Sequence, residues 1–217
     1  MALGESALSA HESFLRDGYN DRLYKGFSVE DEKRTVLVLG GYLGDSVQEW
    51  ISRFNYKVEV VEPIHDFAEA LNQRFQNEDD VHIHEIAVSN FDGNLRLHGS
   101  DDATGAFTAN LGDTDVNLVK CIKFSTFLGS LSRTPKIVEM NIEGGEYQVL
   151  EDAIQSGVIR EIKTLIVQFH NIGNSSEFDR AKLRQSLSNT HECTFNYEWI
   201  WERWDSKPPA DPLVAND

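Results

Sequence analysis

Short runs of hydrophobic residues alternate along the chain with longer stretches in which hydrophobic residues recur every three or four positions. The runs are rich in β-branched and aliphatic side chains, and we expect strands at 35–39, 57–61, 81–88, 137–142 and 163–169. Helical spacing follows most of them, which predicts helices over 46–54, 64–75 and 178–188 and one that ends at Gly157. Such alternation predicts an α/β fold: a doubly wound, mostly parallel sheet with helices on both faces.

Three local patterns add detail to this outline. Ser46 and Glu49 have capping-box spacing, so we expect the Ser46 side chain to cap the helix that starts there. Asp92-Gly93 is a turn signal after the third run, which predicts a side ribbon with the short run that follows it. Aromatic residues occupy alternate positions over 195–201, which predicts one strand whose aromatic face lies in the core.

The polarity of the remaining segments suggests three parts of the chain. We expect a helical cap over 1–34, a central domain over 35–206 and a flexible, proline-rich tail over 207–217. Residues 99–117 are polar and contain four aspartates and three glycines, so we expect a mobile loop that could act as a lid.

The charge balance restricts the classes of partner. The chain has 217 residues, with 20 Lys and Arg against 36 Asp and Glu, and a formal net charge of -16. Nucleic acids and anionic membranes attract basic proteins, so we expect neither as a partner and favour a small neutral or cationic ligand. Two cysteines are too few for a disulfide framework, and no run approaches the ~18 apolar residues of a membrane span, so we expect a cytoplasmic protein.

The candidate site residues follow the predicted strands. Sheets of this kind bind ligands at the carboxyl ends of their strands, which here are Gly40 to Asp45, Glu62, Ala87, Asn141 to Glu146 and His170. His82 and His84 share one side of a strand, but no third ligand accompanies them, so we expect no metal site.

The turn after the first strand discriminates between nucleotide-like ligands. A dinucleotide fold needs glycine at the second position of G-x-G-x-x-G, where the backbone touches a pyrophosphate. Tyr42 occupies that position and Asp45 the third, so a diphosphate is disfavoured, whereas the cationic, phosphate-free S-adenosylmethionine is not. Glu62 ends the second strand near the ~20-residue offset at which an acid holds ribose hydroxyls. Alternatively, Gly40 and Gly44 only permit close helix packing and Glu62 is a solvated strand end.

Four segments resemble the FkbM-type S-adenosylmethionine-dependent methyltransferases. They are Val36-Leu-Val-Leu-Gly-Gly-Tyr-Leu-Gly44, Val60-Val-Glu-Pro63, Ala87-Val-Ser-Asn-Phe-Asp-Gly93 and Ile142-Glu-Gly-Gly-Glu-Tyr-Gln-Val-Leu150. The resemblance implies a seven-strand methyltransferase sheet over 35–206 and methylation of a hydroxyl on a sugar or secondary metabolite. The resemblance also implies how the cofactor is bound. Gly40, Gly41 and Tyr42 would line its methionine and ribose end, Glu62 would hold the ribose, and Ile64 and Ala87 would flank the adenine.

The chain departs from the family pattern at four positions. Val38 replaces an acid in the first strand, and the family acids at Ser125, Asn141 and Gln168 have become neutral polar residues. Hydrogen bonding is kept at the last three positions while charge is lost, which could reflect a different substrate, a different cofactor anchor or a lost activity. We keep Asn141 as a cofactor-binding candidate.

Methyl transfer to a hydroxyl requires alignment of the reactants and a general base. We expect a neutral His170 to be the base and Glu143 to orient the acceptor or the cofactor's amino group. Glu146 stands on the first turn of a helix, where a carboxylate complements the helix dipole, and we expect it to be structural. Glu139, Asn141 and Glu143 alternate along one strand, and in a central strand such acids indicate a site, because a buried charge needs a partner.

Two other functions remain open at this point. One is an adenosyl-binding or interaction module without catalysis, suggested by the four departures. The other is an NAD-type oxidoreductase, which the residues of the first turn disfavour.

Overall fold

The computed structural model describes residues 12–15, 23–29, 34–98, 116–173 and 175–208. Most of the expected N-terminal cap, the loop 99–115 of the expected lid and the tail from 209 onward lie outside the described residues. Residues 116 and 117, which we assigned to that loop, belong to a strand.

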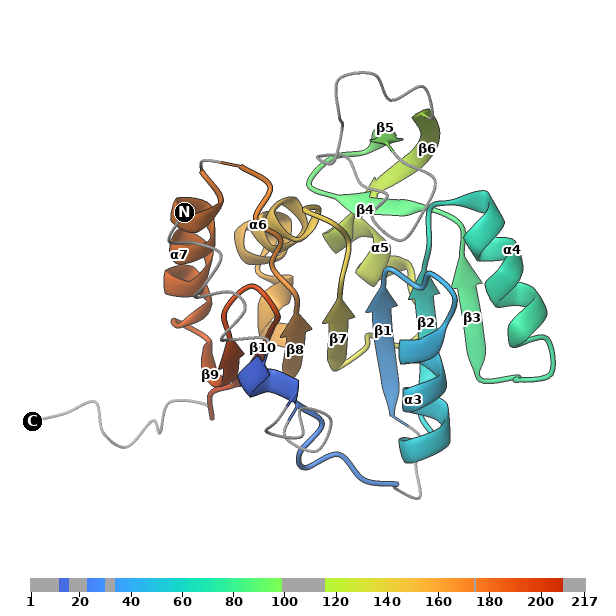
Figure 1. The fold of residues 1–217 in the computed structure, drawn as a ribbon, viewed down its shortest axis with the longest axis horizontal. Helices are drawn as coiled ribbons and strands as arrows, with labels where there is room; N and C mark the ends of the chain where they lie inside the picture. Colours follow the sequence, from blue (N-terminus) through green and yellow to red (C-terminus); the bar gives the residue numbers. More distant parts are fainter. Residues whose placement is uncertain (1–11, 16–22, 30–33, 99–115, 174, 209–217) are drawn as a thin grey trace, which may run out of the picture.

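A seven-stranded sheet forms the centre of the molecule, in the order β3-β2-β1-β7-β8-β10-β9. Its strands are β1 (Thr35–Leu39), β2 (Lys57–Val61), β3 (Val81–His84), β7 (Ile137–Met140), β8 (Thr164–Val167), β9 (His191–Tyr197) and β10 (Trp201–Ser206). Strands β1, β2, β3, β7 and β8 run parallel to one another, and β10 is antiparallel to both its neighbours, β8 and β9. Figure 1 shows the arrows of β1, β2, β3, β7 and β8 pointing toward one edge of the sheet. The expected mostly parallel, doubly wound sheet is confirmed.

Helices cover both faces of this sheet, because alternate strand residues point to opposite sides. The helices are α3 (Asp45–Phe54), α4 (His65–Arg74), α5 (Phe124–Ser130), α6 (Glu146–Ser156), the short 3₁₀ helix η1 (Val158–Glu161) and α7 (Ser176–Leu187). Leu37 and Leu39 pack in one core with residues of α5 and α6. Val36 and Val38 pack in the other with residues of α3 and α4.

The described parts of the N-terminal segment pack on the α3 face. Phe14, Leu23 and Tyr24 are buried in the same core as Trp50 of α3. Arg203 of β10 donates from Nη1 to the carbonyl oxygens of Leu23 (2.9 Å) and Lys25 (2.7 Å). These residues therefore complete the core of the central domain.

The strand expected over 81–88 is two strands in two sheets. β3 ends at His84, whose carbonyl accepts from the N–H of Ile86 (2.9 Å) in a tight turn. The chain then enters a three-stranded sheet of order β4-β6-β5, formed by β4 (Ala87–Ser89), β5 (Gly93–His98) and β6 (Val116–Lys123). The prediction that the strands on either side of Asp92-Gly93 pair with each other is therefore wrong, because β6 lies between β4 and β5. The small sheet lies beyond the carboxyl edge of the large one (Figure 1).

The aromatic stripe over 195–201 is also interrupted. β9 and β10 form an antiparallel hairpin, and Trp199 occupies its turn with φ 60, while the N–H of Ile200 donates to the carbonyl of Tyr197 (3.0 Å). Phe195 is buried in the α3-side core, as expected of the stripe, but Trp199 packs against the opposite core.

Within the described residues, no helix has the length and hydropathy needed to cross a membrane.

Candidate functional site

The strand order places a topological switch point at the carboxyl ends of β1 and β7. From β1 the chain continues to β2 and β3 on one side, and it returns on the other side at β7. Open α/β sheets bind their ligands at such a switch point. The turn after β1 and the segment after β7 therefore lie next to each other.

Glycine is required in the turn after β1. Gly40 has φ 89, and a Cβ atom there would lie 2.0 Å from the carbonyl oxygen of Asn141, which follows β7. A Cβ atom on Gly41 would lie 2.5 Å from a methyl group of Val60 on β2. The turn thus lies close to the backbone that follows β7 and to the side chain of Val60 on β2, which leaves no room for a side chain at either glycine.

Gly44 has a different role. A Cβ atom at this position would lie 2.6 Å from the ring of Phe75 at the end of α4, and the residue has φ 89. For Gly44 the close-packing alternative is therefore the better account.

Glu62 points into the glycine turn and is 5% exposed. Its carboxylate accepts hydrogen bonds from the backbone N–H groups of Tyr42 (2.9 Å) and Ile64 (3.0 Å). Burial raises the pKa of Glu62, and hydrogen bonds from the N–H groups of Ile64, Tyr42 and Gly41 counteract part of the rise. Glu62 is therefore not a solvated strand end, and a carboxylate has about four acceptor positions, more than these donors fill.

Two residues of the site have a strained backbone. Tyr42 has φ 42 and Glu143 has φ 49, in the left-handed region that non-glycine residues rarely adopt. Such strain is concentrated at functional sites, where the surrounding structure enforces it. Tyr42 is 40% exposed, and its ring meets that of Phe67 edge to face at 4.8 Å.

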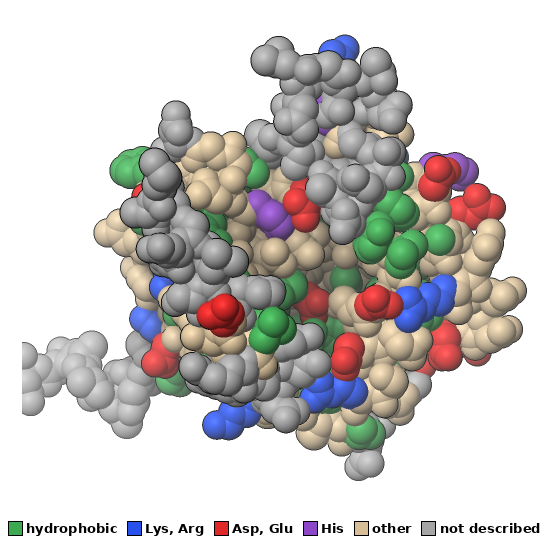
Figure 2. Space-filling model, in the orientation of Figure 1, with side chains coloured by type: hydrophobic (Ala, Val, Ile, Leu, Met, Phe, Trp, Pro, Cys, Tyr) green, Lys and Arg blue, Asp and Glu red, His purple; other side chains and the backbone are tan. Residues whose placement is uncertain are grey.

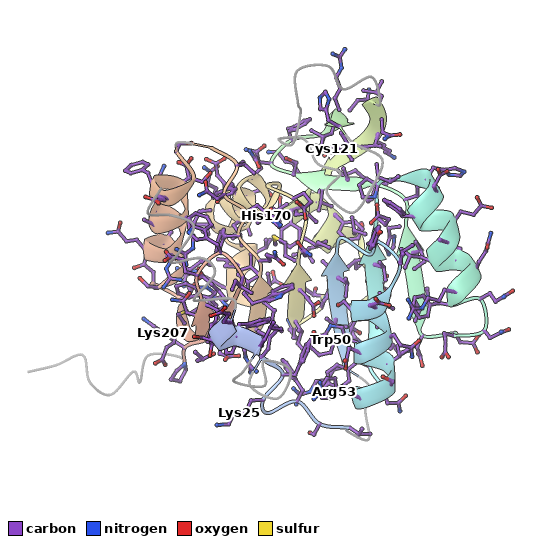
Figure 3. All side chains as sticks on the ribbon, viewed as in Figure 1. Lys25, Trp50, Arg53, Cys121, His170 and Lys207 are labelled. Atoms are coloured by element: carbon purple, nitrogen blue, oxygen red, sulfur yellow. The ribbon has the colours of Figure 1, made fainter. Side chains whose placement is uncertain are left out.

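His170 lies between two carboxylates. Its Nδ1 is 2.5 Å from Oε1 of Glu146, and its Nε2 is 3.1 Å from Oε1 of Glu143. Glu143 and Glu146 flank the start of α6, and His170 follows β8, so the segments after two adjacent strands build the cluster. Figure 3 shows His170 at the carboxyl edge of the sheet, beneath the small sheet that carries Cys121.

The charge of His170 differs from our expectation. Burial alone would lower its pKa, but hydrogen bonds and Coulombic attraction from Glu143 and Glu146 outweigh that effect and raise it to about 9. The ring is therefore cationic at neutral pH and donates from both nitrogens. A cationic imidazole cannot accept a proton, so a base role for His170 requires a change in its surroundings.

Glu146 is held more firmly than a first-turn acid needs to be. Its side chain is fully buried, and it accepts from the N–H groups of Gly144 (2.8 Å) and His170 (2.9 Å) as well as from the His170 ring. The hydroxyl of Tyr147 donates to the carbonyl of His170 (2.7 Å). These bonds fix the position of the histidine.

The other predicted cofactor residues lie around the same edge. Ile64 precedes α4 and is 8% exposed, Ala87 begins β4 and is 4% exposed, and Asn141 is exposed after β7. The N–H groups of Ile64 and Tyr42 both donate to the Glu62 carboxylate, and the N–H of Asn141 donates to the carbonyl of Leu39 (3.0 Å). Ala87 pairs with Cys121 of β6 in the small sheet.

Glu139 is a buried acid beneath the turn. In the sequence it stood out only because it alternates with Asn141 and Glu143 along one strand. Glu139 of β7 is 4% exposed and accepts from Trp50 Nε1 (2.7 Å), the Tyr24 hydroxyl (3.2 Å) and the Ser46 hydroxyl. Burial raises its pKa, and these three donors counteract part of the rise. Val38 is its register partner on β1.

The same contact shows that the expected capping box is wrong. The N-cap of α3 is Gly44 in a left-handed conformation, with no side-chain cap, and the Ser46 hydroxyl bonds to Glu139 instead. The Ser46 hydroxyl, which we expected to cap the helix, bonds to a carboxylate that lies far away in the sequence.

No cluster suited to a metal ion occurs among the described residues. His82 and His84 both approach Glu59 of β2, at 3.6 Å and 2.7 Å between side-chain atoms, and they lie on the edge strand β3.

Acidic groups dominate the charged side chains near the site. Figure 2 shows acidic side chains scattered over α3 and α4 and a histidine beside an acidic side chain near the middle of this face. Arg74, the basic residue near the glycine turn, is already paired with Asp45 (2.8 Å).

Solved structures of methyltransferases share this fold. A protein from Clostridium thermocellum, provisionally described as an rRNA methylase, has a TM-score of 0.52 and 12% identity over 88% of this chain and 96% of its own. A protein from Streptococcus mutans, provisionally described as a methyltransferase and solved in complex with SAH, has a TM-score of 0.52 and 7% identity over 87% of this chain and 96% of its own. No protein-family model and no curated protein matches the sequence. The chain has the Rossmann-like methyltransferase fold.

Proposed function

We propose that the protein is an S-adenosylmethionine-dependent methyltransferase that methylates a hydroxyl group on a small molecule such as a sugar or secondary metabolite. The observation that carries this proposal is the placement of Glu62, buried against the glycine turn with acceptor positions to spare. The complex of the Streptococcus mutans protein with SAH supports the choice of cofactor.

The residues at the switch point fit this cofactor. Glu62 would hold the ribose hydroxyls, and Gly40 and Gly41 let the turn lie close to the segments that flank it. The remaining contacts are assigned to Tyr42 and Asn141 at the methionine end and to Ile64 and Ala87 at the adenine. When bound, the cofactor supplies a methyl group on a sulfonium cation, and the acidic site suits that charge.

An NAD-type dinucleotide fits less well. Tyr42 stands with a positive φ where the dinucleotide motif needs its second glycine, so a side chain occupies the place of the pyrophosphate. The only basic side chain described at the turn, Arg74, is engaged by Asp45 and by the carbonyl of Leu43.

The acceptor is best described as small and uncharged or cationic. The net charge of -16 opposes a polyanionic acceptor such as RNA, because nucleic-acid affinity comes largely from Lys and Arg at phosphates. Glu143 would orient the acceptor or the amino group of the cofactor, and His170 would receive the hydroxyl proton, for which a base typically contributes ~10²–10⁴-fold in rate.

A second candidate is a module that binds the cofactor without transferring its methyl group. The pairing of both His170 ring nitrogens with carboxylates favours this alternative, because no free nitrogen is left to act as a base. Measured turnover distinguishes the two candidates.

Isothermal titration calorimetry with S-adenosylmethionine tests the binding half of the proposal. We expect the wild-type protein to bind, and Glu62→Ala to lose about 10- to 100-fold in affinity, the worth of hydrogen bonds to a charged group. Glu69→Ala, which removes an exposed acid from α4, is the matched control and should bind normally. Absence of binding to the wild type would refute the proposal.

Formation of SAH with a library of sugars and polyols tests the catalytic half. Turnover with any hydroxyl acceptor supports the methyltransferase, whereas binding without turnover across the library supports the second candidate.

A further inference from the structure

The two carboxylates around His170 differ in how firmly they are held. Glu146 is fully buried and accepts three hydrogen bonds, two of them from backbone N–H groups. The Glu143 side chain is 22% exposed, and its Oε1 lies 3.1 Å from Nε2 of His170. One carboxylate is therefore fixed, and the other is able to turn away.

Glu143 also lies where a bound cofactor would meet it. It follows Asn141 by two residues at the carboxyl end of β7, and the carbonyl of Asn141 touches the glycine turn. Its backbone is held at φ 49, so the surrounding structure directs it into this position. A carboxylate at this edge has two cations to choose from: the imidazolium of His170 and the ammonium group of the cofactor.

We propose that Glu143 exchanges partners, holding Nε2 of His170 in the empty site and releasing it when the ammonium group of the cofactor binds, while Glu146 keeps Nδ1 and the ring orientation. This inference rests on the proposed function. In the empty site His170 is a cation. When Glu143 turns away, one of the two carboxylates that stabilise the cation is lost, so the Nε2 proton passes to water and the ring becomes neutral.

The exchange reconciles the paired histidine with a base role. The neutral ring carries its hydrogen on Nδ1, facing Glu146, and presents a free lone pair on Nε2. In the transfer step the acceptor oxygen forms a bond to the methyl carbon, the carbon–sulfur bond breaks with its electrons remaining on sulfur, and the hydroxyl proton passes to Nε2. Glu146 is then a positioning residue, and the base forms only when the site is loaded.

The groups around His170 support this assignment to Glu143 and Glu146. From α6, Glu146 contacts the ring and the Tyr147 hydroxyl contacts the backbone carbonyl. From α7, Arg180 lies over the neighbouring ring of Phe169 and is neutralised by Glu202 and Glu198. After burial, the largest contributions to the His170 pKa shift come from Glu143 and Glu146.

Titration of the histidine ring signals by NMR tests the exchange, with SAH and 5′-methylthioadenosine as probes. SAH carries the amino acid group, whereas 5′-methylthioadenosine keeps the ribose and adenine but lacks it. We expect saturating SAH to lower the His170 titration midpoint by at least about two pH units, to 7 or below, which is about a hundredfold loss of proton affinity. 5′-Methylthioadenosine should leave the midpoint unchanged while shifting the amide signal of Tyr42.

Two variants and one internal control make the test specific. Glu143→Gln should lower the His170 midpoint without ligand and abolish the further shift that SAH causes. Glu146→Gln should also lower the His170 midpoint without ligand, but SAH should still shift it. His65, which pairs with Glu85 on the exposed surface, should titrate identically in all states. Binding of SAH, seen at Tyr42, without a change at His170 overturns the exchange alone. Failure of both probes to bind overturns the proposed function and the exchange together.

Discussion

Two buried acids on and after β7, seven residues apart, are treated differently by the fold. Among the described residues, Glu139 accepts from the uncharged donors of Tyr24, Ser46 and Trp50, and burial raises its pKa. Glu146 is more deeply buried but has the imidazolium of His170 against it. The first acid joins the N-terminal segment, α3 and the sheet, and the second joins the strand-end loops of the candidate site.

The difference shows what a buried carboxyl group needs from its neighbours. A cluster of neutral donors satisfies the oxygens but leaves the desolvation of the charge uncompensated, so it serves structure. A titratable partner compensates the charge and also responds to it, so such a cluster can change state with pH or ligand. Variants on either side should therefore respond differently to pH.

The largest effect on stability is expected from Glu139→Ala. It leaves three buried donors without an acceptor, at about 1–3 kcal/mol each, so the free energy of unfolding should fall by about 4 kcal/mol. Glu139→Gln keeps an acceptor oxygen and should lose only about 1 kcal/mol. Urea denaturation of both variants measures the difference, and equal stability of the two would contradict the structural role of this acid.

A somewhat smaller effect is expected from the charge of His170. Its folded pKa, raised to about 9 from an ordinary 6.5, contributes stability that is fully present below pH 6.5 and is lost as the pH rises through 9. The full contribution is about 3 kcal/mol. The wild type should lose that much relative to His170→Gln between pH 6 and pH 10, measured by urea denaturation. A stability difference that does not vary with pH would show that the ring is not held as a cation.

The smallest effects compare the tyrosine of each cluster. Tyr24→Phe removes a hydrogen bond to the carboxyl group of Glu139 and should cost about 2 kcal/mol, whereas Tyr147→Phe removes one to a backbone carbonyl and should cost about 1 kcal/mol. Thermal unfolding ranks the two variants. The reverse order would mean that the Glu139 cluster holds the N-terminal segment less firmly than its contacts indicate.

The elements that could be predicted from the sequence are those whose residues are determined by local burial. The predicted bounds of β1 and β2 match the structure at every residue. Both are runs of β-branched and aliphatic residues typical of buried strands, and the first ends at a glycine turn and the second just before a proline. The arrangement of Glu62 against the turn also follows from strand order alone. The roles assigned to the site residues remain predictions.

The errors arose where a distant group decides the local structure. Ser46 has the spacing of a cap, but Glu139 lies 93 residues away and takes its hydroxyl. The turn at Asp92-Gly93 could not reveal that β6, later in the chain, inserts between β4 and β5. The sequence also did not indicate that two carboxylates approach the His170 ring, because only the fold brings Glu143 and Glu146 to it.

The central claim is that the Glu62 carboxylate holds the ribose hydroxyls of an adenosyl cofactor. Calorimetric titration of SAH and of its 2′,3′-dideoxy analogue into the wild type and Glu62→Ala tests it most directly. The account predicts that the wild type binds SAH at least about tenfold more tightly than the analogue, and that the ratio falls close to one in the variant, because the hydroxyls have lost their partner. An equal ratio in both proteins would contradict the claim.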